Sequence, residues 1–189
     1  MIHDALSGGF ADAPLQSSRA FRAILDALAR PGTLHDVTGA EPPAPLSQAA
    51  GVLLLTLADG TTPVHLAGEA DTPAARDWIT FHTSAPLVGP SEAVFALGTW
   101  AALQPLHRFA IGSAEYPDRA ATLIVEMPAL SSLGPRLRGP GIADHATLSL
   151  PETAAFRANR ALFPLGFDCF FTAGACLAGL PRSTIVEDL

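Results

Sequence analysis

The chain has 189 residues, of which 49% are hydrophobic and 15% charged, and its formal net charge is −7. A chain of this length can bury about 70% of the surface that it exposes when unfolded, which suits one domain over residues 1–189. The acidic balance excludes a broad basic surface for nucleic acid, and the absence of lysine excludes a pyridoxal phosphate Schiff base and the lysine of a Walker loop.

The low content of charged residues has two explanations, which the sequence leaves open. Either the chain is simply rich in alanine, or part of its surface is covered by a partner. The N-terminal stretch MIHDALSGGFADAP lacks the basic region of a signal peptide, and no apolar run is long enough to span a membrane. We therefore expect a cytoplasmic protein with no membrane contact, in which Cys169 and Cys176 are reduced.

The first predicted helix lies in SSRAFRAILDALARPG, residues 17–32. Ser17 or Ser18 can cap its start, and Pro31 with Gly32 ends it. One apolar stripe at helical spacing is expected to face the core: Phe21, Ile24, Leu25 and Leu28. The arginines of this segment are expected on the solvent side: Arg19, Arg22 and Arg30.

Two further helices and a strand follow. LSQAAGVLLLTLADG, residues 46–60, predicts a largely buried helix capped by Ser47. TPVHLAG, residues 62–68, predicts a strand. DTPAARDWITFHTSA, residues 71–85, predicts a helix capped by Asp71 or Thr72, with Pro73 in its first turn.

The second half of the chain contains more strands than helices. Buried strands are expected in AVFALG (93–98) and AATLIVEM (120–127), with a short helix in TWAALQPL (99–106) between them. Further along, the expected elements are a strand end running into a turn at 136–142, a helix within the segment 151–166 that stops before Pro164, and a hairpin of FDCFFT and ACLAGL at 167–180. This order favours an α/β fold in three layers, a mixed sheet flanked by helices.

The cysteines, histidines and carboxylates provide no convincing catalytic set. With the hairpin turn placed at residues 173 and 174, Cys169 and Cys176 share a face on a diagonal of about 7 Å, so we expect two core residues and no disulfide. No two of the six histidines have metal-ligand spacing, although a zinc site built from distant residues stays open. Glu115 and Asp118 fit a solvated loop, and a serine nucleophile motif is absent.

LRGPGIADH, residues 137–145, offers the best candidate for binding an anion. Its glycines could form a backbone cradle for phosphate, but a turn is the stronger expectation. If residues 136–138 form a strand, Arg136 and Arg138 point to the same side. They could then grip a phosphate or pair with acidic residues of a neighbouring subunit.

Several short segments, taken in order, resemble the PhnH family. The segments are FRAILDALARPG at 21–32, YPDRAATL at 116–123, GPGI at 139–142, FPLGFD at 163–168 and LPRST at 180–184. Each is weak by itself, but the ordered set extends from Phe21 to Val186 and is specific. The sequence is therefore identified as that of a PhnH-like domain.

The resemblance implies a subunit of the bacterial carbon–phosphorus lyase machinery, which degrades organophosphonates. In that pathway an alkylphosphonate displaces the adenine of ATP, giving a ribose 1-phosphonate 5-triphosphate. The family acts with PhnG, PhnI and PhnL in this step, forms a core complex with PhnG, PhnI and PhnJ, and forms homodimers. Its fold is similar to the large domain of pyridoxal-phosphate-dependent transferases without the cofactor, so no cofactor, no metal and no catalytic residue are expected here.

Two alternatives differ in class from a complex subunit. The first is a stand-alone nucleotide- or phosphonate-binding protein or enzyme, with Arg136, Arg138 and Arg182 as its anion ligands. The second is a simple homodimer whose apolar face meets its own copy, which is compatible with the subunit role.

Overall fold

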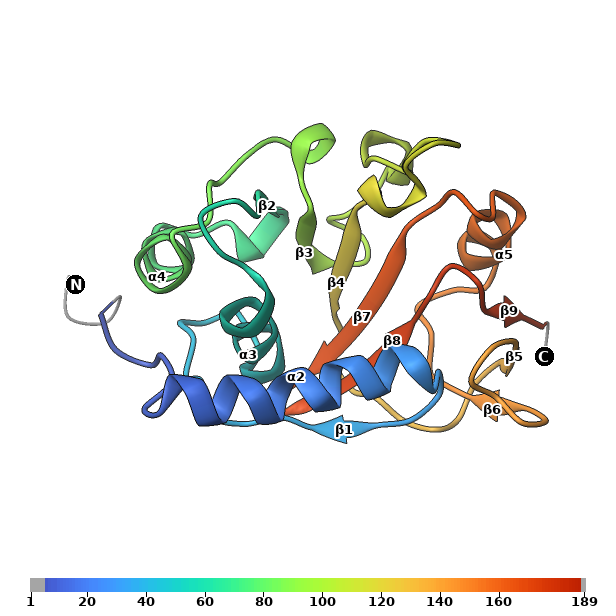
Figure 1. Ribbon diagram of the computed structural model, residues 1–189, viewed down its shortest axis with the longest axis horizontal. Helices are drawn as coiled ribbons and strands as arrows, with labels where there is room; N and C mark the ends of the chain where they lie inside the picture. Colours follow the sequence, from blue (N-terminus) through green and yellow to red (C-terminus); the bar gives the residue numbers. More distant parts are fainter. Residues whose placement is uncertain (1–5, 188–189) are drawn as a thin grey trace.

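A computed structural model describes residues 6–187 as an α/β structure built on two sheets (Figure 1). The large sheet has the strand order β1-β8-β7-β4-β3-β2, and the small sheet has the order β6-β5-β9. The strands of the large sheet are β1 (His35–Asp36), β2 (Val64–Leu66), β3 (Phe95–Thr99), β4 (Thr122–Glu126), β7 (Asp168–Ala173) and β8 (Cys176–Leu180). Those of the small sheet are β5 (Arg136–Arg138), β6 (Ala146–Thr147) and β9 (Ile185–Val186). The α-helices are α2 (Ala13–Ala29), α3 (Gln48–Leu57), α4 (Pro73–Thr83) and α5 (Ala154–Ala161).

The large sheet is mixed and buried on both faces. Strands β2, β3, β4 and β7 are parallel, β8 runs antiparallel to β7, and the edge strand β1 runs antiparallel to β8. Because side chains alternate along a strand, Ile124 and Phe170 pack towards α2, α3 and α4, whereas Val125 and Phe171 pack towards α5 and the small sheet. The predicted mixed sheet flanked by helices is confirmed.

Helix α2 differs from its prediction in both start and orientation. It begins at Ala13, capped by Asp12, whose carboxylate accepts a hydrogen bond from the Leu15 amide at 3.2 Å, so Ser17 and Ser18 are not its caps. The buried residues are Ala20, Ile24 and Ala27, whereas Phe21 and Leu25 of the predicted stripe are 49% and 57% exposed. The cause lies opposite the helix, where a Cβ at Gly179 of β8 would come within 2.7 Å of the Ala27 carbonyl group. Small residues on both sides let α2 lie close to the sheet.

Helices α3 and α4 confirm the predicted starts. The Ser47 hydroxyl accepts a hydrogen bond from the Ala50 amide at 3.2 Å, and the Thr72 hydroxyl accepts one from the Ala75 amide at 3.1 Å. Of the two caps considered for α4, the structure therefore selects Thr72. No helix within residues 6–187 has the length and apolar character that crossing a membrane requires.

Two elements of the second half need correction. The helix predicted at residues 99–106 is instead a turn that leads into the short 3₁₀ segment Leu106–Arg108, next to Pro105. Helix α5 begins at Ala154 rather than at Pro151, and it ends at Ala161, before Pro164 as expected.

The turn of the β7–β8 hairpin lies one residue later than predicted, which shifts the pairing of the two strands by two residues. The turn is formed by Gly174 and Ala175, so Ala173 pairs with Cys176 and Cys169 pairs with Leu180. Cys169 therefore lies roughly 13 Å along the strand from the partner of Cys176, farther than the predicted diagonal. Both cysteines are free; Cys169 is buried as a core residue, and Cys176 is partly exposed.

Candidate functional site

The GPGI segment is a turn, as expected, and it closes on helix α2. The Ile142 amide donates to the Gly139 carbonyl at 3.2 Å, and Gly141 has φ +81°, which is the type II pattern with Pro140 at the second position. A Cβ at Gly141 would overlap the carbonyl oxygen of Ala29 at the end of α2. The turn therefore has a packing role, and its glycine is required by both conformation and close approach.

Arg182 holds three of the family segments together. Its guanidinium donates to both carboxylate oxygens of Asp168, at 3.1 and 2.6 Å, and to the Pro117 carbonyl at 2.8 Å, and its own amide donates to Asp168 at 2.7 Å. The Arg182 side chain is only 12% exposed. LPRST, FPLGFD and YPDRAATL are thus joined at one point, which we name the Arg182 junction (Arg182, Asp168 and Pro117).

Arg136 and Arg138 lie away from such a junction, on the outer face of the small sheet. Both are exposed, and Leu137 between them is fully buried, so the two arginines share one side as the strand pattern predicts. Arg138 forms an ion pair with Glu187 at 2.9 Å. Of the three arginines predicted as anion ligands, Arg136 and Arg138 therefore share one exposed surface, whereas Arg182 is partly buried in the Arg182 junction.

The histidines do not gather into a metal site within the described part of the chain. No group of three or more histidine, cysteine, aspartate or glutamate side chains there could hold a metal ion. His145 contacts Asp144 at 2.8 Å, and this hydrogen bond is the main cause that lowers the pKa of the Asp144 carboxyl. His3 lies outside the described residues.

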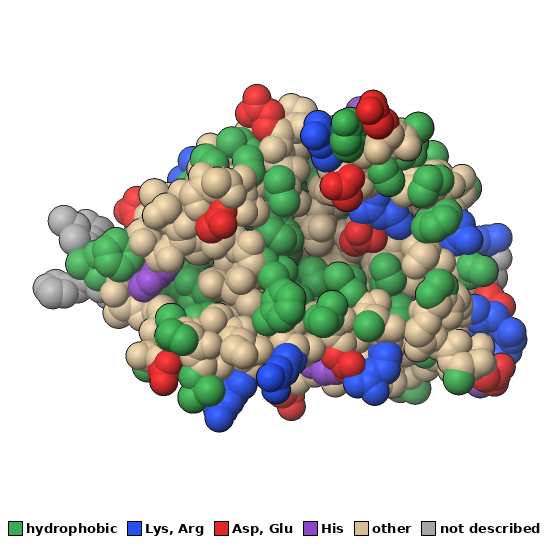
Figure 2. All heavy atoms as spheres, viewed as in Figure 1, with side chains coloured by type: hydrophobic (Ala, Val, Ile, Leu, Met, Phe, Trp, Pro, Cys, Tyr) green, Lys and Arg blue, Asp and Glu red, His purple; other side chains and the backbone are tan. Residues whose placement is uncertain are grey.

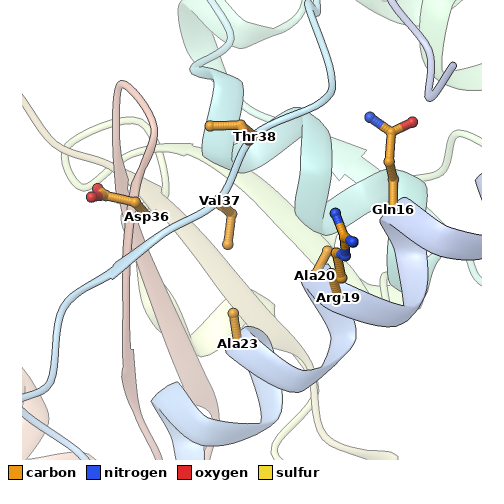
Figure 3. Close-up of a pocket in the computed structure, with 7 residues that line it drawn as sticks. All are labelled: Gln16, Arg19, Ala20, Ala23, Asp36, Val37 and Thr38. Atoms are coloured by element: carbon orange, nitrogen blue, oxygen red, sulfur yellow. The ribbon is translucent and has the colours of Figure 1, made fainter. Parts of the chain in front are cut away.

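One cavity, of about 270 Å³, separates α2 from the segment after β1 (Figure 3). Gln16 and Arg19 rise from α2 beside Val37 and Thr38, whereas the Asp36 side chain points away. Gln16 is already engaged, because its carbonyl oxygen accepts from the Asp12 amide at 2.7 Å. The cavity thus places Arg19 near the backbone of residues 37–38, and its lining does not bring several reactive side chains together.

A larger cavity, of about 500 Å³, opens at the carboxyl ends of the parallel strands. Residues from β3, β4 and the segments after β2 and β7 meet there with the start of α3: Pro45, Ser47, Glu69, Thr99, Glu126, Met127, Pro128 and Gly174. We name it the strand-end crevice. Open α/β sheets bind their ligands in this position, because the loops that follow parallel strands converge there.

Glu126 is the most unusual group of the strand-end crevice. It is the last residue of β4, and its carboxylate accepts hydrogen bonds from the Ser47 amide at 2.8 Å and from the Thr172 hydroxyl at 3.0 Å. Burial raises the pKa of Glu126, and the hydrogen bonds from Ser47 and Thr172 oppose this rise only in part. A carboxyl group that keeps its proton more readily can donate as well as accept hydrogen bonds.

The lining of the crevice is acidic and hydroxylic. Glu69, Glu126, Ser47 and Thr99 contribute polar side chains, and none of the lining residues is an arginine. Such a lining accepts hydrogen bonds from hydroxyl or amino groups and disfavours anions. Sequence reasoning missed this site, although a carboxylate directly after the apolar run of the TLIVE strand was an available signal.

Comparison with known proteins extends the match over nearly the whole chain. Residues 8–187 match the family described as "Bacterial phosphonate metabolism protein (PhnH)". The chain belongs to the PhnH family. It is also 41% identical, over 192 aligned positions covering 96% of this chain and 95% of the relative, to "Alpha-D-ribose 1-methylphosphonate 5-triphosphate synthase subunit PhnH" of Rhizobium meliloti (strain 1021).

The geometry explains why the short PhnH segments occur together. FPLGFD, LPRST and YPDRAATL share the Arg182 junction, and GPGI packs against the end of FRAILDALARPG at Ala29. The segments that identify the PhnH family are thus contacts between distant parts of the fold. In this chain these segments therefore hold distant parts of the fold together.

Proposed function

We propose that this PhnH chain is a subunit of the carbon–phosphorus lyase system and supports formation of ribose 1-methylphosphonate 5-triphosphate from ATP and an alkylphosphonate. The observation that carries the proposal is the identity of 41% to a subunit of that synthase, over 95% of the relative's length. An identity of this size over a whole chain makes a shared role in one assembly the simplest interpretation.

Its partners are PhnG, PhnI, PhnJ and PhnL, and in isolation the chain forms a homodimer in the cytoplasm. Exposed Phe21 and Leu25, one helical turn apart on α2, support an apolar contact surface for such a partner. The fold is that of the large domain of pyridoxal-phosphate-dependent transferases without the cofactor, in a single domain over residues 1–189. The missing lysine is consistent with this proposal.

Reconstitution tests the subunit role directly. The chain is purified alone and together with PhnG, PhnI and PhnL, and ATP with methylphosphonate is followed by phosphorus NMR. We expect product only when this chain and its partners are combined. Product formed by the isolated chain, or formed equally well by the partners without it, would overturn the proposal.

A second candidate function, binding of a nucleotide or phosphonate by the chain itself, has its own structural support. Arg136 and Arg138 project from one side of β5, as an anion site requires. Arg182 is the third residue of the proposed set, although its guanidinium already has Asp168 and Pro117 as acceptors. Calorimetric titration of the isolated chain with ATP tests this candidate, and absence of binding at millimolar ATP would exclude it.

A further inference from the structure

The end of the molecule formed by α5, β5 and β9 concentrates positive charge in an acidic chain. Arg157 and Arg160 of α5 join Arg136 and Arg138 of β5 there, so that four of the eleven arginines lie on two elements that both contact β9, in a chain whose net charge is −7. Figure 2 shows basic side chains at this end of the molecule, with acidic ones beside them. Charge concentrated against the overall balance calls for a local explanation.

A cavity of about 400 Å³ opens between α5 and the edge strand β9. Arg157, Arg160, Ile185, Val186 and Glu187 line it. Arg157 and Arg160 are three positions apart and therefore share one side of α5. We name this cavity the α5–β9 pocket.

Arg160 contacts an aromatic ring, and one of its nitrogen atoms, Nε, has no acceptor among residues 6–187. This Nε is buried. The guanidinium carbon of Arg160 lies 4.8 Å from the centre of the Phe163 ring, a cation–π contact. A buried donor without an acceptor is costly, and an oxyanion in the pocket would relieve that cost.

The backbone of β9 adds a donor on the same side. The Glu187 amide donates to the Arg136 carbonyl at 2.9 Å, so the amide of Val186, the preceding residue, points away from β5 to the free edge beside α5. Glu187 is the acidic residue of the lining, and its carboxylate is already paired with Arg138 at 2.9 Å. Arg138 thus reduces the repulsion that Glu187 would exert on an anion.

From this arrangement we infer that the α5–β9 pocket binds an oligophosphate group. Planar guanidinium groups and a free amide match the oxygens of phosphates, and several arginines suit a chain of phosphates better than a single phosphonate. The inference deepens the proposed function and rests on it for the biological ligand, since the name of the Rhizobium relative specifies a 5-triphosphate. The pocket would hold the triphosphate end, whereas the acidic strand-end crevice is unsuited to it.

Titration calorimetry of the full chain with inorganic triphosphate, ATP and methylphosphonate tests the inference. We expect one triphosphate or ATP per chain, and at least tenfold weaker binding of methylphosphonate. Arg160→Gln should weaken triphosphate binding by about tenfold or more, because one charged hydrogen-bonding group is lost. The matched control Arg22→Gln, an exposed arginine of α2, should stay within about twofold.

Three results would overturn the inference: no binding at millimolar triphosphate, equal losses in Arg160→Gln and Arg22→Gln, or methylphosphonate binding as tightly as triphosphate. If Arg160→Gln does not fold, two other measurements replace it: triphosphate binding by Arg157→Gln, and the salt dependence of triphosphate binding by the unmutated chain. Binding that changes neither with Arg157→Gln nor with salt would count against the pocket. If the reconstituted complex is active but its PhnH chain does not bind triphosphate, the binding role of the α5–β9 pocket is overturned and the proposed function is not. A chain that binds triphosphate but adds nothing to the complex would overturn the proposed function alone.

Discussion

Two arginines of this chain, Arg182 and Arg160, show how one residue type takes two roles. At the Arg182 junction, the guanidinium donates to Asp168 and Pro117 and joins three family segments. In the α5–β9 pocket, Arg160 rests on Phe163, and its buried Nε has no acceptor within the described part of the chain. The difference teaches that an arginine whose acceptors are in place serves the scaffold, whereas a buried donor without an acceptor points to a ligand only where it also lines a cavity, as Arg160 does. The Nε of Arg108 is likewise without a partner among residues 6–187.

Removing the arginine of the junction should have the largest effect on stability. Arg182→Gln leaves the partly buried Asp168 carboxylate without its ion pair, and we expect the free energy of unfolding to fall by about 3 kcal/mol. Urea unfolding measures the change, and Arg22→Gln should stay within about 0.5 kcal/mol. A loss below about 1 kcal/mol would remove the distinction between the two arginines.

Gly141→Ala should destabilise the same scaffold by a smaller amount, about 2 kcal/mol, since it adds left-handed strain and an overlap with Ala29. Two other glycines separate these causes. Gly174 has φ +57° in open space, so Gly174→Ala reports the strain alone, and Gly89 has φ −70° in open space, so Gly89→Ala should be nearly neutral. Equal losses for Gly141→Ala and Gly174→Ala would show that the contact with α2 contributes nothing.

Glu126 combines features of both regions. Its carboxyl group accepts hydrogen bonds from two neighbours, and it also lines the strand-end crevice. Glu126→Ala should cost about 1–2 kcal/mol, because the Ser47 amide and the Thr172 hydroxyl lose their acceptor. Burial raises the pKa of Glu126 in the folded state, so the folded state keeps this proton to higher pH than the unfolded state. The associated stability is present at low pH and is lost as pH rises through the folded-state pKa.

The neutral variant Glu126→Gln isolates this pH dependence. Unfolding free energies of the variant and of the unmutated chain are compared from about pH 4 to about pH 8, and the variant should gain relative stability as pH rises. A difference that stays constant with pH would contradict a raised pKa for Glu126.

The smallest effect on stability is expected at the arginine-rich end. Arg138→Gln removes an ion pair with Glu187 in which the two side chains are 47% and 35% exposed. Solvent screens such a pair, so the free energy of unfolding should change by less than about 1 kcal/mol in chemical denaturation. A loss as large as that of Arg182→Gln would show that the two regions do not differ.

The sequence predicted best those elements whose ends are determined locally. Ser47, Thr72 and Pro73 begin helices α3 and α4, and the GPGI turn follows from the preferences of proline and glycine. In the predicted stripe of α2, Ile24 and Leu28 do pack on the core, but Phe21 and Leu25 do not. Gly179, far along the chain, favours contact with Ala27 instead. Helix orientation depends on the opposing surface, which periodicity does not contain.

The candidate sites show the same limit. Alternation along a strand correctly placed Arg136 and Arg138 on one side. The partners of Arg182 lie 14 and 65 positions away, and the two walls of the α5–β9 pocket come from separate elements. Long-range pairing of this kind, like the register of the β7–β8 hairpin, follows from the assembled fold rather than from local spacing.

Thermal unfolding of Arg182→Gln and Arg160→Gln, each with and without saturating triphosphate, tests the distinction between the two arginines most directly. The account predicts opposite defects. Arg182→Gln should unfold at a lower midpoint but keep the rise that triphosphate produces, and Arg160→Gln should unfold near the unmutated midpoint and lose that rise. If Arg182→Gln loses the rise and Arg160→Gln keeps it, the assignment of scaffold and binding roles is contradicted.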